Sequence, residues 1–170
     1  SALAATPDIF ISQVQIEGEQ TSDDFVAIRN DEHCAVDLSG WKLRKRTASG
    51  SESSVRVFGN GSILPPGETF IWASSTENFA DTIKANEQSS ATLARDNAIA
   101  LLDGDSVIID SIAWGVIQKP FRLSDTPVEN PGKNESVYRA AAGGPASAGQ
   151  TEIPKATSLD GGDFDLCGAS

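Results

Sequence analysis

His33 is the only histidine in the sequence, so a Ser-His-Asp or Cys-His catalytic arrangement would have to use it. The obvious nucleophile, Cys34, is its direct neighbour. In an extended chain the two side chains would point to opposite faces. The sequence also lacks the Gly-x-Ser-x-Gly turn that presents a catalytic serine. We therefore expect His33 to be a solvated loop residue, and we expect the protein not to be an enzyme.

Three further stretches have the composition of ligand sites. The Asp-Gly turns at 103–105 and 160–165 could offer oxygen ligands to Ca²⁺, but neither matches the helix–loop–helix calcium loop. Aspartate beside glycine is also what tight turns require. Residues 144–151 have the spacing of a phosphate-binding loop, with Gln150 in place of the essential lysine and Pro154 where the following helix would run. We expect no metal and no cofactor.

Four basic side chains gather on one segment, which we name the basic strip: Lys42, Arg44, Lys45 and Arg46. The chain as a whole has a formal net charge of -11, which repels phosphate backbones, so nucleic acid is disfavoured as a general partner. The strip itself could bind a polyanion, and replacing Lys42, Arg44 and Arg46 with glutamine should then abolish that binding. We favour the alternative, an edge strand that its charges protect from aggregation, because no aromatic residue accompanies them.

The two cysteines, Cys34 and Cys167, are too few for a disulfide framework or for a zinc site with the usual paired spacing. A bridge between them would close a very long loop and stabilise the fold by roughly 4–5 kcal/mol in the chain-entropy model. Two free thiols are the alternative, and we favour the bridge. Residues 2–5 resemble the small-residue end of a secretory signal, so we expect an extracellular or cell-surface location.

Short strands separated by turns must position all of these side chains. Alternating apolar residues predict strands at 9–16, 25–30, 36–44, 55–58 and 69–73, and a hairpin formed by 98–102 and 107–114 around an Asp-Gly turn. Gly40 interrupts the alternation, which predicts a bulge or bend that turns Trp41 into the core. All three tryptophans lie in apolar strands and are predicted to be core residues. One helix is predicted at 76–85. No apolar run approaches the length of a membrane span.

Several segments, in this order, resemble the lamin-tail domain. They are residues 25–30, the segment Asp37-Leu38-Ser39-Gly40-Trp41, the turn Leu64-Pro65-Pro66-Gly67 and the hairpin at 98–114. The similarity covers residues 8–115, and more weakly 137–139 and 163–164. The resemblance implies an immunoglobulin-like β-sandwich with no catalytic residues of its own. Members of the nuclear lamina join filaments and contact chromatin, whereas bacterial members are exported or surface-associated modules that are often fused to hydrolases or nucleases.

The predicted fold class is all-β: an immunoglobulin-like β-sandwich with a Pro/Gly-rich C-terminal extension. Residues 1–7 are predicted to be a tag or linker, 8–166 the domain and 167–170 a tail. Because the chain has no heptad rod and is strongly acidic, it resembles the bacterial members. The resemblance then implies a non-catalytic interaction or anchoring module that binds a protein or a surface polymer. The alternative is a substrate-binding accessory domain of a secreted hydrolase or nuclease. The identity of the partner and the oligomeric state stay open.

Overall fold

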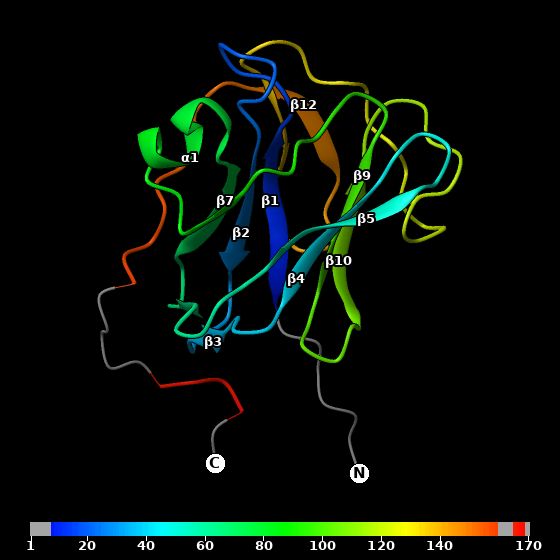
Figure 1. The fold of residues 1–170 in the computed structure, drawn as a ribbon. Helices are drawn as coiled ribbons and strands as arrows, with labels where there is room; N and C mark the ends of the chain where they lie inside the picture. Colours follow the sequence, from blue (N-terminus) through cyan, green and yellow to red (C-terminus); the bar gives the residue numbers. More distant parts are fainter. Residues whose placement is uncertain (1–7, 160–164, 169–170) are drawn as a thin grey trace.

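The computed structural model describes residues 8–159 and 165–168, and these form two β-sheets packed face to face (Figure 1). The larger sheet contains β1 (Ile9–Gln15), β2 (Phe25–Asn30), β7 (Thr69–Ser74), β8 (Glu87–Ser89), β11 (Ser136–Arg139) and β12 (Ala146–Gln150). Its strand order is β12-β11-β1-β2-β7-β8. The smaller sheet contains β4 (Lys42–Arg46), β5 (Glu52–Val57), β9 (Ala98–Leu102) and β10 (Ile108–Ala113), in the order β10-β9-β4-β5. The predicted sandwich is therefore confirmed.

The main core lies between the two sheets, where alternate side chains of each strand meet. Trp72 and Trp114 are fully buried there and Trp41 is 9% exposed, which confirms that the tryptophans are core residues. The indole N–H of Trp72 donates to Ser89 Oγ at 3.0 Å, and that of Trp114 to the carbonyl of Ala94 at 2.7 Å. Because each buried indole has a hydrogen-bond partner, the large rings are buried without an unpaired donor.

A second, smaller core covers the outer face of the larger sheet. Phe25, Ala27 and Ile71 of β2 and β7 pack there against the short helix α1 (Phe79–Thr82) and against Ala156. The predicted helix at 76–85 is wrong in its extent. A 3₁₀ turn, η1 (Thr76–Asn78), precedes α1, and the backbone leaves the right-handed helical region within it, with Glu77 at φ 55° and Asn78 at φ 59°.

The segment predicted as one strand at 36–44 is divided. β3 (Val36–Asp37) pairs with β6 (Ile63–Leu64) in a small separate ladder, and β4 begins only at Lys42. Gly40 lies between them with φ +79°, a conformation that glycine adopts without strain. The predicted bend at Gly40 is confirmed, and it turns Trp41 into the core.

The C-terminal third contains more regular structure than its composition predicts. The stretch at 140–158, part of the predicted Pro/Gly-rich C-terminal extension, includes β12, which forms the edge of the larger sheet. The sulfurs of Cys34 and Cys167 are joined in a disulfide, with the two Cα atoms 5.0 Å apart. Beside it, Ala35 pairs with Leu166 as a parallel bridge. Leu166, the predicted end of the domain, and Cys167, the predicted start of the tail, are thus both bound to the β2–β3 connection.

Candidate functional site

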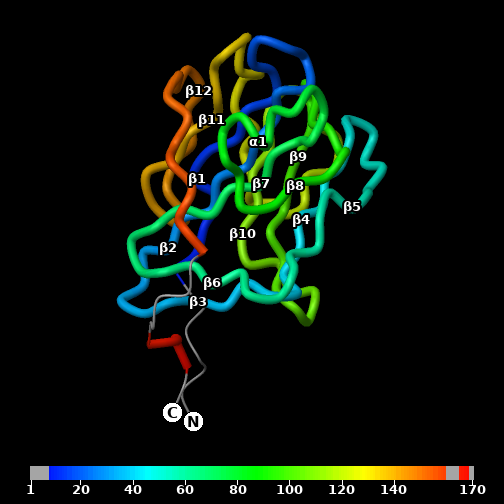
Figure 2. Tube along the Cα trace, turned by 60° about the vertical axis from the view of Figure 1, so that its left-hand side comes forward, coloured from blue at the N-terminus to red at the C-terminus, as the bar shows by residue number. Residues whose placement is uncertain are grey.

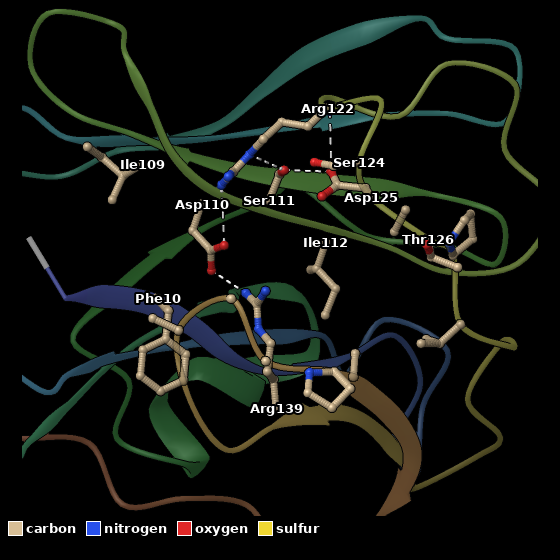
Figure 3. Close-up of a pocket in the computed structure, with 18 of the residues that line it drawn as sticks. Phe10, Ile109, Asp110, Ser111, Ile112, Arg122, Ser124, Asp125, Thr126 and Arg139 are labelled. Atoms are coloured by element: carbon tan, nitrogen blue, oxygen red, sulfur yellow. Dashed lines mark hydrogen bonds and ion pairs between the residues drawn. The ribbon is translucent and has the colours of Figure 1, made fainter. Parts of the chain in front are cut away.

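A cleft of about 880 Å³ opens between the two sheets along the free edge of β10. β10 forms one wall, the first residues of β1 and the end of β11 form the other, and two loops at 122–128 and 142–145 form the rim (Figure 3). A cluster of charged and hydroxyl side chains lies in it. The cleft therefore brings charged and hydroxyl side chains from both sheets and from a loop close together.

Asp110 lies at the base of the cleft and is 6% exposed. It interrupts the apolar run of β10, and strand alternation places it on the same inner face as Ile112. Its carboxylate accepts hydrogen bonds from Arg139 Nη2, from the backbone N–H of Ile11 at 2.6 Å and from Arg122 Nη2 at 3.4 Å. Burial raises the pKa of Asp110, while the charge of Arg139, the Ile11 amide and Arg122 act in the opposite direction.

Arg139 ends β11 and is 7% exposed. Besides Asp110, it binds the carbonyl oxygen of Ile11, with Nε at 3.3 Å and Nη2 at 3.1 Å. β11 pairs with β1 only at Gln13–Gln15, so β11 provides no backbone partner for Ile11 of β1. Arg139 and Asp110 together therefore bond the carbonyl and the N–H of Ile11. Their first role is to cap the uncovered part of β1.

The outer half of the cleft is built around Ser111. Its hydroxyl donates to Asp125 Oδ2 at 2.6 Å and accepts from Arg122 Nε at 2.9 Å. The side chain of Arg122 is 40% exposed, which makes it far more accessible than Asp110 or Arg139. His33 does not line the cleft. Because the serine has no neighbouring base other than a paired aspartate, the geometry suits recognition of polar groups better than proton transfer.

The basic strip lies outside the cleft, on an interior strand. β4 is flanked by β9 and β5, so the predicted edge-strand role of the strip is wrong. Arg44 Nε and Arg46 Nε both bind the carboxylate of Glu52 on β5, at 2.6 and 2.9 Å. The hydrogen bond from Arg44, followed by that from Arg46, lowers the pKa of Glu52 against the effect of burial. Half of the strip's charge is therefore engaged within the fold.

The other strip residues also have partners. Lys42 Nζ donates to Ser106 Oγ at 2.6 Å, and Lys45 Nζ donates to the carbonyl of Thr92. The expectation that no aromatic residue accompanies the strip is wrong as well. Arg46 Cζ lies 4.4 Å from the ring centroid of Phe121, which is 75 positions further along the chain. Phe121 belongs to the connection between β10 and β11, which places its ring against the strip.

The remaining predicted features have structural roles. His33 is exposed on the β2–β3 connection. Asp103 Oδ1 accepts the backbone N–H groups of Asp105 and Val107, at 2.9 and 3.0 Å, as a turn aspartate does. The acidic stretch at 160–165 falls outside the described residues except for Asp165. Among the described residues, the one group with metal-ligand spacing is Glu32, Cys34 and Cys167, and its two sulfurs are bonded to each other.

Sequence reasoning missed a second buried carboxylate, Asp24, at the start of β2. It is fully buried, and its Oδ2 accepts the backbone N–H of Leu93 at 2.7 Å. Its Oδ1 has no hydrogen-bond partner among the described residues. Burial raises the pKa of Asp24 from 3.8 to about 7, and the hydrogen bond from the Leu93 N–H and the charge of Lys45 only partly offset this.

A family model for the lamin tail domain matches residues 2–116, which are 115 of the 170 residues. The chain belongs to the lamin tail domain family. This confirms the resemblance seen at 8–115, and with it the immunoglobulin-like fold of a non-catalytic domain family. No curated protein matches this lamin tail domain. None of its described helices has the length and hydropathy of a membrane span.

The matched region and the cleft overlap only in part. Asp110 and Ser111 lie inside the match, whereas Arg122, Asp125 and Arg139 follow its last residue. The cleft of this lamin tail domain is therefore completed by residues beyond the matched segment.

Proposed function

We propose that this lamin tail domain is a non-catalytic interaction or anchoring module of an exported or surface-associated bacterial protein. The observation that carries the proposal is the disulfide between Cys34 and Cys167. Disulfides persist in oxidising environments such as the periplasm and the cell surface, and they are rare in the reducing cytosol. The described residues contain no free cysteine. Both thiols of the sequence are thus used in a form that suits export.

The attachment role rests on what the cleft presents. Its charged groups are bonded to one another, so they form a fixed polar surface with Arg122 as the accessible cation. Concave sites that hold a few fixed polar groups are typical of surfaces that bind a ligand or partner. These features support binding as the function of the domain.

The location can be tested on intact cells of the source bacterium. A membrane-impermeant biotin reagent should label the protein on whole cells or in the medium, and alkylation before reduction should leave Cys34 and Cys167 unmodified. A cytosolic control protein should stay unlabelled. Recovery of this chain only from the cytosol, with both cysteines alkylated, would refute export.

The alternative, a substrate-binding accessory domain of a secreted hydrolase or nuclease, has one observation in its favour. The ring of Phe121 beside Arg46 gives the basic strip an aromatic neighbour of the kind that polymer-binding surfaces use. Against it, Glu52 neutralises Arg44 and Arg46 at close range. We therefore prefer the interaction or anchoring role, and polyanion binding by the strip distinguishes the two.

A further inference from the structure

The free edges of the two sheets differ in how they are protected. An open strand edge offers unpaired N–H and C=O groups to any extended chain, so proteins commonly cover or charge it. At β10, the backbone N–H of Val128 donates to Ala113 at 3.1 Å, and that of Gly115 donates to Val128 at 2.7 Å. The inward-facing Asp110 and the side chain of Arg122 lie at the other half of the strand. The β10 edge is therefore blocked by the protein itself.

The edges formed by β5 and β8 cover each other. Arg56 on β5 binds Glu87 on β8 at 3.0 Å, and Ser89 Oγ donates to the carbonyl of Val55 at 2.6 Å. The second oxygen of Glu87 accepts the backbone N–H of Gly59 at 2.7 Å. These bonds close the sandwich on the side away from the cleft.

β12 is less protected than these edges. Its sequence, Ala-Ser-Ala-Gly-Gln, contains no charge and no proline. Its hydrogen-bonded strand neighbour is β11, and among the described residues no backbone bond joins β12 to a further element. The strand lies at the outer margin of the molecule (Figure 2). The register with β11 shifts at Gly149, which has φ +112°, so a bulge interrupts the C-terminal end of the strand. Residues 146–148 are thus the part of this edge that the described chain leaves without a covering element and without charge.

We propose that β12 accepts an extended segment of a partner protein as an additional strand of the larger sheet, which would deepen the proposed interaction role and rests on it. In strand addition, backbone hydrogen bonds provide the affinity and alternate side-chain positions provide the selectivity. The small side chains of Ala146, Ser147, Ala148 and Gly149 leave the backbone accessible from the edge.

Charge indicates which partner segment fits. The carboxylate of Glu135 lies beside Gly149, and Glu152 follows the strand by two residues. The whole chain has a formal net charge of -11. A segment with an uncharged β-branched centre and basic ends is therefore favoured, because its charges complement those around the edge. Two copies of this chain, each strongly acidic, would repel one another at the same edge.

The proposal can be tested with a synthetic probe, the capped peptide Lys-Val-Thr-Val-Thr-Val-Lys, added to the whole chain at concentrations up to about 1 mM, a range suited to a short weak ligand. Hydrogen exchange measured by NMR should show new protection of those β12 amides that do not donate to β11. A peptide with N-methyl groups on alternate residues cannot donate along that edge and should bind at least about tenfold more weakly. Glutamate in place of both lysines should also weaken binding.

A matched pair of variants separates strand addition from general charge effects. Ala146 packs against the core, and alternation places Ala148 on the same inner face, whereas Ser147 is exposed. In Ala148→Lys the inward lysine must extend past the sheet edge to reach water, and we expect at least about a tenfold loss of peptide affinity. Ser147→Lys adds the same charge on the outer face and should change affinity less than about threefold.

Four results would overturn the proposal: no protection of β12 amides by the peptide, equal binding of the N-methylated peptide, wild-type affinity in a folded Ala148→Lys, or a wild-type dimer whose β12 amides are protected without peptide. The last result would make a second copy the occupant. If strand addition fails, the proposed exported anchoring role is not affected. If the protein is found in the cytosol, the result for β12 is not affected. The two proposals are therefore tested separately.

Discussion

Replacing Asp24 with asparagine should remove a large pH-dependent contribution to stability. The carboxyl has its ordinary pKa of 3.8 in the unfolded chain and a pKa of about 7 in the folded one. The folded state therefore holds the proton more tightly. Stability from this group is fully present below about pH 4 and is lost as the pH rises through about 7. Three pKa units at 1.36 kcal/mol each correspond to about 4 kcal/mol.

The measurement is thermal unfolding of both proteins between about pH 4 and pH 8. In a domain of this size, 1 kcal/mol shifts Tm by about 2–4 °C, so the Tm of wild type minus that of Asp24→Asn should fall by about 10 °C across this range. The exposed Glu129→Gln variant serves as a control and should follow the wild-type profile. Parallel profiles for wild type and Asp24→Asn would refute the reasoning, because they would mean that Asp24 titrates alike in the folded and unfolded chains.

Three further predictions concern the remaining features. Reduction of the Cys34–Cys167 bond, which spans 133 residues, should cost about 4–5 kcal/mol in urea unfolding, and Cys167→Ser should reproduce the loss without reductant. Arg139→Met should destabilise the fold by about 3–5 kcal/mol because it leaves Asp110 buried without its closest cation, and adding Asp110→Asn should recover part of this in the same assay. The triple glutamine variant of the basic strip should elute from heparin as wild type does, because Glu52 already neutralises two of its charges, and an earlier elution of the variant would support the polymer-binding alternative.

Strands with strong local signals were predictable from the sequence. Residues 25–30 form β2 with the predicted bounds, because a run of β-branched and aromatic residues ends at a polar turn. The hairpin of β9 and β10 follows from two apolar runs around Asp103 and Gly104. In contrast, β12 consists of residues with low strand propensity and exists because β11 offers it a partner. Pairing with a neighbouring strand determines whether such a segment becomes a strand, and a local sequence pattern does not reveal that pairing.

The cleft was predictable only in fragments. Asp110 stands out as a charge within an apolar strand, but its partner Arg139 is 29 residues away on the other sheet. Likewise, the cluster of basic residues that identified the basic strip gave no sign of Glu52 as its counterion or of Phe121 as its aromatic neighbour. These contacts depend on the order of the strands and on the path of the connection between β10 and β11. Neither produces a periodic pattern in the sequence.

The Cys34–Cys167 bond also determines how the domain would respond to mechanical tension. A pull on both sides of the domain passes through β1 and β2 to Cys34 and leaves across the sulfurs at Cys167. Residues 35–166, which lie between the two cysteines, stay out of the load path, so about 450 Å of chain, at about 3.4 Å per residue, cannot extend. Until the bond is reduced, a stretched tether containing this domain could therefore lengthen only through the residues outside the disulfide loop, and reduction would allow the rest of the sandwich to extend.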